Sequence, residues 1–331
     1  MTTHRVFGAG LIGGYVAGAL LACDQTVSVV ARPRVQAKLT TGIVLTDLDG
    51  NRAAVPGPHF ANPDDTPADF LWLTVKCTGV QSAVPDMRAH VGPETVILCC
   101  QNGLGSEQPV KDAFPESIVL RAMVPFNVAR LADNHLHRGS GGALTLEYHP
   151  RLDVLRNVLR TPLMPLHFSR DMDATLWAKL QLNLVNAINA LSDVPVRAML
   201  EQRGYRRAYA ACMRELLRVT AAMDIKLPKL TALPSPWLPR MLELPDWLFR
   251  LLAKPMLEVD PTVRTSMWWD LSQGKPTEIA HLNGAVVTHG QYTGVPTPVN
   301  EQVVRLVRAV ELGSETQGFT PPRLLREIGV S

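Results

Sequence analysis

A short stretch in the second half of the chain carries the residue types needed to bind and protonate a small polar molecule. Lys179, Asn183 and Asn186 stand at positions i, i+4 and i+7 of an otherwise apolar run, so one helix would place all three on a single face. Polar side chains in such a stripe are costly to bury unless they meet partners. Facing a cleft, one ammonium and two amides would suit a ligand with a carboxylate and a carbonyl group. The alternative is an exposed polar face, which would normally carry more charges.

A second group of polar residues follows about eighty positions later. Ser266 and Asp270 lie four residues apart, and Glu278 comes shortly after them. The Ser266 hydroxyl could donate a hydrogen bond to a carboxylate. Thr277 could equally be a helix N-cap, with Glu278 as a first-turn acid that interacts with the helix dipole. The residue types leave the binding role and the capping role open.

The start of the chain carries a glycine pattern between a strand-like run and a helix-like run. The strand is expected over residues 5–7, the helix over 15–23, and a second, β-branched strand over 26–31. In this context the pattern is the dinucleotide-binding fingerprint, in which the glycines permit a tight turn, close approach of a pyrophosphate and close packing of helix on sheet. Free N–H groups at the helix start would bind the phosphates. The expected cofactor contacts are Gly8, Gly10, Leu11, Ile12 and Gly13.

The end of the second expected strand indicates which dinucleotide is bound. NAD-binding versions usually place an acid there to hold the ribose hydroxyls. This strand instead runs into Arg32, Pro33 and Arg34, with no acid. Guanidinium groups pair well with a phosphate, so Arg32 predicts NADP(H). The alternative is a pair of solvated arginines in a loop.

Further strands are expected over residues 69–76 and 95–100, followed by others over 118–127 and 142–148. Ligands of open α/β sheets bind beyond the carboxyl ends of the strands. Lys76 and Asn102 fall at two such ends, which makes them expected cofactor or substrate contacts. A solvated lysine and an ordinary Asn-Gly turn are the alternatives.

Helical patterns replace the strands after about residue 170. Helices are expected over 171–191, 204–223, 267–273, 278–290 and 299–313. The predicted fold class is α/β, with an N-terminal Rossmann-type doubly wound sheet over residues 1–168 and an all-α domain over 169–331. The proline-rich segment 227–261 is expected to form short helices packed on the second domain. A lid, a dimer contact and, less well supported because of the prolines, a surface membrane helix are the alternatives.

Composition excludes several classes of protein. The 331 residues are 46 % hydrophobic and 19 % charged with a net charge of +3, which is typical of a globular protein and not of a nucleic-acid-binding one. No apolar run reaches a membrane span, and the strand at the N-terminus leaves no room for a signal peptide. The five cysteines form no CxxC pair and the nine histidines no HxxxH pattern. We therefore expect a cytoplasmic protein without a metal, a disulfide framework, a nucleic-acid partner or a membrane partner.

The motifs, taken together and in order, resemble the ketopantoate reductase (2-dehydropantoate 2-reductase) family over nearly the whole chain. They are GAGLIGG, Lys76 at a strand end, QNGLG, WAKLQLN, SMWWD and PTEIAHLNG. The resemblance implies a Rossmann domain followed by a helical domain, and an enzyme that uses NADPH to reduce ketopantoate to pantoate on the route to pantothenate and coenzyme A.

The resemblance also implies roles for single residues. Lys179 matches the catalytic lysine and Glu278 the active-site glutamate, while the substrate side is represented by Asn183, Ser266 and the further polar position Asp270. Asn186 joins the substrate-binding residues because it belongs to the same stripe. Arg32 matches the contact to the 2′-phosphate, and Lys76 and Asn102 match other cofactor contacts.

One departure concerns the substrate. The family often has an asparagine eight residues after the catalytic lysine, where this chain has Ala187. Asn186 or Asn189 could substitute for it, although neither lies on quite the same face. The alternative function is therefore an NADP-dependent reductase of a different 2-oxo acid or ketone. The expected partner is a small 2-oxo acid, and the apolar second domain leaves a homodimer open.

Overall fold

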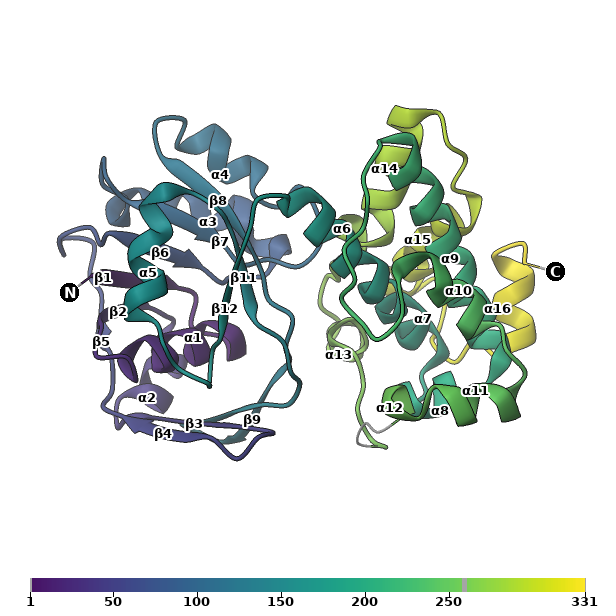
Figure 1. Ribbon diagram of the computed structural model, residues 1–331, viewed down its shortest axis with the longest axis horizontal. Helices are drawn as coiled ribbons and strands as arrows, with labels where there is room; N and C mark the ends of the chain where they lie inside the picture. Colours follow the sequence, from purple (N-terminus) through teal and green to yellow (C-terminus); the bar gives the residue numbers. More distant parts are fainter. Residues whose placement is uncertain (1, 258–260, 331) are drawn as a thin grey trace. The chain divides into compact units, whose positions relative to one another are not determined.

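The computed structural model describes residues 2–257 and 261–330, which form two compact units (Figure 1). The first unit runs to Asn102 and resumes over Ser106–Met172. The second contains Gly103–Gly105 and the chain from Asp173 onward. The sequence did not predict that the short Gly103–Gly105 stretch belongs with the helical unit. Within the described ranges, no helix has the length and hydropathy needed to cross a bilayer.

The first unit is built on an eight-stranded sheet with the order β12-β11-β8-β7-β6-β1-β2-β5. The neighbouring strands are parallel except for β11 against β8. The strands are β1 (Thr3–Phe7), β2 (Thr26–Val30), β5 (His59–Phe60), β6 (Phe70–Leu73), β7 (Val96–Cys99), β8 (Ile118–Met123), β11 (Leu144–Glu147) and β12 (Leu166–Ser169). A separate four-stranded sheet contains β4 (Arg52–Val55), β3 (Ile43–Asp47), β10 (His135–Arg138) and β9 (Val128–Ala132).

Helices cover both faces of the large sheet because its strands are apolar on both sides. Val6 and Trp72 pack in the same cluster as Tyr15 and Leu20 of α1 (Leu11–Leu21). The alternating residues, such as Leu71, pack instead with α3 (Val80–Met87) and α4 (Gln108–Ala113). The remaining helices of this unit are α2 (Pro33–Leu39) and α5 (Asp153–Val158). This is the doubly wound sheet that the sequence predicted.

The register of the central strands brings their carboxyl ends together. Phe7 at the end of β1 lies opposite Val30 of β2 and Leu73 of β6, and Leu73 lies opposite Cys99 of β7. The chain passes from β1 through α1 to β2 on one side, whereas β6 lies on the other side of β1. Strand order therefore reverses at β1, which is where open α/β sheets bind their ligands.

The second unit consists of helices around one large apolar core. The longest helix, α9 (Arg203–Ala222), packs against several of its neighbours (Figure 1). The others are α6 (Met172–Asn183), α7 (Val185–Ser192), α8 (Val196–Leu200), α10 (Leu238–Leu242), α11 (Asp246–Leu252), α12 (Lys254–Leu257), α13 (Ser266–Ser272), α14 (Asn283–Thr293), α15 (Pro298–Glu311) and α16 (Pro321–Glu327). The expected all-α domain is confirmed, and the exact boundary after residue 168 stays a prediction.

Two of the expected helices are interrupted. The helix expected over 171–191 is split at Leu184 into α6 and α7, because the Tyr209 hydroxyl of α9 donates to the Leu182 carbonyl at 2.9 Å. A side chain that bonds to a carbonyl of the helical ladder is a common cause of helix breaks. The helix expected over 278–290 begins only at Asn283, after a 3₁₀ turn over Ile279–His281.

The proline-rich segment forms short helices, as expected, and a buried arginine ties them to α9. The Arg206 guanidinium donates to the carbonyls of Leu200, Leu242 and Leu244 at 2.8, 2.9 and 2.7 Å. It also pairs with Asp246 at 2.9 Å. The segment contains α10, α11, α12 and a 3₁₀ turn over Ser235–Trp237, while its residues 258–260 lie outside the described residues.

Candidate active site

At two of the three glycines in the turn after β1, a residue with a side chain would not fit. Gly8 has a φ of +95°, a conformation that favours glycine. A Cβ at Gly13 would lie 2.2 Å from the Gly8 carbonyl oxygen and 2.3 Å from Thr74 Oγ1. The Thr74 hydroxyl itself donates to the Gly8 carbonyl at 2.5 Å. Helix α1 can therefore lie this close to the sheet only with glycine at position 13.

The third glycine leaves open space at the start of the helix. A Cβ at Gly10 would meet no atom of the described chain within 4 Å, although Gly10 is the N-cap of α1. The following N–H groups, at Leu11, Ile12 and Gly13, have no acceptor within the helix. The first turn of α1 carries no acidic side chain. The turn thus offers free donors, the positive end of a helix dipole and room for a phosphate.

Three predicted cofactor contacts follow the strands that end beside this turn. Arg32 comes just after β2, Lys76 just after β6 and Asn102 just after β7, and all three side chains are exposed. Because these strands are parallel, the three residues lie on the same edge of the sheet as the glycine turn. Among the residues that the structure describes, the Arg32 guanidinium has no ion pair or hydrogen bond. It is therefore available to an anion.

The lysine and asparagine stripe lies on two helices of the second unit. Lys179 and Asn183 are one turn apart on α6, and both are half-buried. Burial lowers the pKa of the Lys179 ammonium, which makes its proton easier to lose than that of a solvated lysine. Asn186 follows the break at Leu184 and lies on α7. The prediction that a single helix carries all three residues is therefore wrong.

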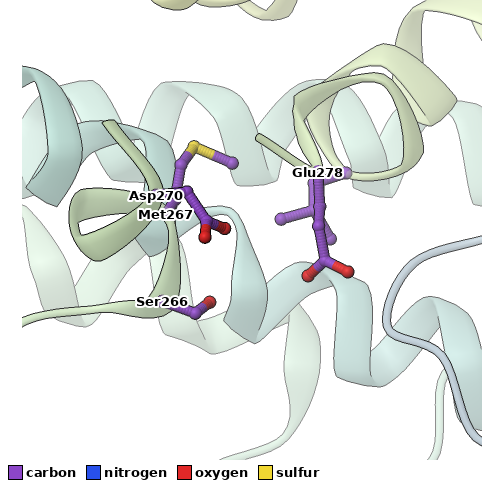
Figure 2. Close-up of a pocket in the computed structure, with 5 residues that line it drawn as sticks. Ser266, Met267, Asp270 and Glu278 are labelled. Atoms are coloured by element: carbon purple, nitrogen blue, oxygen red, sulfur yellow. The ribbon is translucent and has the colours of Figure 1, made fainter. Parts of the chain in front are cut away.

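Ser266, Asp270 and Glu278 come together in a small pocket. They line it with Met267 and Leu282, and Figure 2 shows the Ser266, Asp270 and Glu278 side chains directed into the same region. Asp270 and Glu278 are only 4 % and 6 % exposed, while Ser266 is exposed. Two buried carboxyl groups beside an accessible hydroxyl bring hydrogen-bond acceptors and a donor to one place, while the gap between them is too narrow for a ligand in this structure.

The backbone around Glu278 explains how its side chain comes to line this pocket. The Glu278 carbonyl accepts from the N–H groups of His281 and Leu282 at 3.0 and 3.2 Å, which closes the 3₁₀ turn after it. The Thr277 N–H donates to Glu311 Oε1 at 2.7 Å, and Thr277 Oγ1 accepts from Ile279 N–H at 3.3 Å. The Thr277 hydroxyl thus holds the first N–H of the turn, whose N-cap is Glu278, and Glu278 precedes α14 by several residues. The alternative of Glu278 as a first-turn acid of a helix is wrong.

Sequence reasoning missed the role of the turn that follows Asn102. Gly103 has a φ of +81°, and a Cβ there would lie 2.2 Å from the His281 carbonyl oxygen. The Leu104 N–H donates to the same oxygen at 3.1 Å, and His281 Nδ1 lies 3.1 Å from the Leu104 carbonyl. The glycines of QNGLG were the signal for such a close approach. This turn therefore packs on the 3₁₀ turn that begins just after Glu278.

Comparisons with known proteins show the family to which the chain belongs. A family model described as ketopantoate reductase PanE/ApbA matches residues 5–151, and one described as its C-terminal part matches residues 171–311. The 2-dehydropantoate 2-reductase of Pyrobaculum aerophilum is 26 % identical over 309 residues, covering 93 % of this chain and 97 % of that protein. The enzyme of the same name from Caulobacter vibrioides is 24 % identical, covering 94 % of this chain and 100 % of that protein.

Solved structures give the same result. A PanE/ApbA family ketopantoate reductase from Ralstonia eutropha is similar with a TM-score of 0.78 and 27 % identity, covering 94 % of this chain and 99 % of that one. A D-mandelate dehydrogenase solved with NADH and anilino(oxo)acetate has a TM-score of 0.76, the same two coverages and 18 % identity, a likeness of fold alone. The chain belongs to the ketopantoate reductase family and is a pyridine-nucleotide-dependent oxidoreductase that acts on a CH–OH group.

Proposed function

We propose that this chain reduces 2-dehydropantoate (ketopantoate) to pantoate with NADPH, in the biosynthesis of pantothenate and coenzyme A. The observation that carries the proposal is the pocket of Ser266, Asp270 and Glu278, on the same helical unit as the half-buried Lys179. The names of the full-length relatives support ketopantoate as the substrate.

The cofactor fits the residues at the carboxyl edge of the sheet. The space at Gly10 and the free N–H groups of Leu11, Ile12 and Gly13 suit a pyrophosphate. The exposed Arg32 at the end of β2 suits a 2′-phosphate, which is our reason for proposing NADPH over NADH. Lys76 and Asn102, at the neighbouring strand ends, would contact the rest of the nucleotide.

Lys179 is the proposed general acid. A bound reduced nicotinamide supplies a hydride to the carbonyl carbon of the substrate. As negative charge develops on the carbonyl oxygen, the Lys179 ammonium stabilises it and donates a proton to it. Burial lowers the pKa of this ammonium, so the proton is transferred more readily than from a solvated lysine. Such acid catalysis contributes roughly 10²–10⁴-fold in rate.

The other polar side chains would hold the substrate. The Ser266 hydroxyl would donate to the substrate carboxylate, and the amides of Asn183 and Asn186 would bind its remaining oxygens. The Glu278 carboxylate would accept a hydrogen bond from the substrate hydroxyl or orient Lys179. Asp270, one turn after Ser266, offers a second buried acceptor in the same pocket.

A different 2-oxo acid is the second candidate substrate, and Ala187 is the observation that favours it. Position 187 carries a fully buried alanine, so the chain has no amide here that could bind a ligand. Asn189, considered as a substitute, is also fully buried and uses its side chain within the protein. The D-mandelate dehydrogenase neighbour binds anilino(oxo)acetate on the same fold, which makes aromatic 2-oxo acids worth testing.

The first experiment is a turnover assay that follows NADPH absorbance with ketopantoate, with NADH and a panel of other 2-oxo acids, including phenylglyoxylate, in parallel. Rapid oxidation of NADPH with ketopantoate supports the proposal. Turnover of another 2-oxo acid but not of ketopantoate supports the second candidate. Absence of turnover on the whole panel, despite binding of the nucleotide, refutes both.

We also propose that the enzyme works in the cytoplasm as a homodimer. All five cysteines are free, which suits a reducing compartment. The second unit exposes the large apolar side chains of Trp237, Trp247 and Leu251, which a second copy could cover. Light scattering on the purified protein gives the oligomeric state, and a monomer at micromolar concentration would contradict the dimer.

A further inference from the structure

We propose that Asn189 is a positioning residue of the substrate site, which sets Ser266 and Asp270 by holding the residue before them. This role rests on the proposed function, because it assumes that α13 presents substrate-binding groups. Asn189 lies on α7 and is fully buried. The proposal assigns it no contact with substrate.

The side chain of Asn189 is fully engaged at the junction between α7 and α13. Its Oδ1 accepts from the Thr265 N–H at 3.0 Å and from the Thr265 hydroxyl at 3.1 Å. Its Nδ2 donates to the Val194 carbonyl at 2.7 Å. Thr265 is the N-cap of α13 and directly precedes Ser266, so Asn189 fixes the backbone from which the pocket side chains project.

Other side-chain contacts also join these two helices, but they are more exposed to solvent than those of Asn189. Asp193, at the end of α7, accepts from Trp268 Nε1 at 2.7 Å and from the Arg264 guanidinium at 3.1 Å. These two contacts are exposed, and exposed polar contacts contribute little. The hydrogen bonds of Asn189 are partly buried and Asn189 itself is fully buried, so their loss is felt more strongly than that of the exposed contacts.

Asparagine suits this position because its amide presents an acceptor and a donor at once. A leucine of similar size would leave the Thr265 N–H and the Val194 carbonyl without their partner. The helix that carries Asn189 begins at Val185, directly after the break at Leu184 that follows α6. Asn189 therefore ties Ser266 and Asp270 to the helix that follows the one carrying Lys179.

The test compares Asn189→Leu with the matched control Gln181→Met. Gln181 is also a fully buried amide, and its Nε2 donates to the Ser235 carbonyl at 2.9 Å, away from α13. Two quantities are measured in the full chain: hydrogen exchange of the peptide spanning residues 262–272, and kcat and KM for the 2-oxo acid that the wild type reduces. NADPH affinity serves as the internal reference, because its proposed site lies on the other unit.

We expect Asn189→Leu to speed exchange at Thr265–Asp270 and to lower kcat/KM by about 10–100-fold, because small displacements of binding groups have effects of this size. The affinity for NADPH should stay within about twofold of the wild type, a change too small to indicate lost contacts. Gln181→Met should match the wild type in both exchange at α13 and KM. Unchanged exchange and unchanged KM in Asn189→Leu would overturn the proposal.

A second pair of variants covers the case in which Asn189→Leu does not fold. Thr265→Val removes the hydroxyl that lies 3.1 Å from Asn189 Oδ1 and 3.3 Å from the Asn186 carbonyl of the same helix, whereas Thr265→Ser keeps it. The valine variant should raise KM and the serine variant should not; equal kinetics in the two would overturn the proposal. If the wild type reduces no 2-oxo acid, the proposed function fails, and hydrogen exchange at α13 alone decides whether Asn189 positions this helix.

Discussion

The glycine turn allows cofactor binding to be separated from folding by two substitutions three residues apart. In Gly10→Ala the new methyl group meets no protein atom within 4 Å, and Gly10 is extended, with a φ of −65° and a ψ of −153°, at the edge of the β region of other residues. In Gly13→Ala the methyl group would lie 2.2 Å from the Gly8 carbonyl oxygen. The first change should therefore affect the ligand, and the second should affect the fold.

The structure sets the size of both effects. Gly10→Ala should change stability by no more than about 1 kcal/mol, the scale of a glycine-to-alanine or N-cap change. A methyl group in the space proposed for the pyrophosphate should cost at least one hydrogen bond to a charged group, about 1.5–3 kcal/mol, which is roughly 10–100-fold in the Kd for NADPH. Gly13→Ala should cost about 3 kcal/mol of overpacking, or roughly 6–12 °C in the melting temperature of this unit.

The assay is a thermal melt together with an NADPH titration followed by fluorescence, with Gly139→Ala as the control. A Cβ at Gly139 also meets nothing within 4 Å, and the residue lies outside the glycine turn. The control should keep both the melting temperature and the Kd of the wild type. The reasoning is refuted if Gly10→Ala binds NADPH as tightly as the wild type, or if it melts as early as Gly13→Ala.

Three further substitutions test the remaining assignments. Lys179→Met should lower kcat by roughly 10²–10⁴-fold while NADPH still binds. Because burial lowers the pKa of this lysine, the activity of the wild type should begin to fall with rising pH below the range in which a solvated lysine titrates. The same fall of activity with pH in the variant would exclude Lys179 as its source. Arg32→Ala should weaken NADPH by roughly tenfold and leave NADH unchanged; equal loss for both nucleotides in steady-state assays would contradict the phosphate role. Arg206→Met should destabilise the second unit by about 3–5 kcal/mol, because it leaves buried carbonyls unpaired; calorimetry measures this against Arg240→Ala, whose exposed side chain stacks on Trp237 and should matter little.

The local structure around the proposed cofactor contacts follows from the sequence more directly than the structure around the proposed substrate contacts, for a physical reason. Gly8 and Gly13 are required by contacts with residues of the strand beside them, and Arg32 is placed by the end of the strand it follows. These constraints repeat in every βαβ unit of this type, so a short pattern reveals them. The break at Leu184 is different, because the hydroxyl that causes it belongs to Tyr209 on another helix. No local pattern contains that information.

Polar side chains that reach across from other helices hold the pieces of the proposed substrate site. Tyr209 of α9 binds the carbonyls at the junction of α6 and α7, Asn189 of α7 binds Thr265, and Glu311 of α15 binds the Thr277 N–H. Apolar packing between helices tolerates exchange of similar side chains, whereas a hydrogen bond is lost within a few tenths of an ångström and tens of degrees. Substitutions in the apolar core should therefore reduce stability before they change specificity. Substitutions of these polar groups should change specificity first, because each one holds a segment that carries or adjoins a proposed substrate-binding residue.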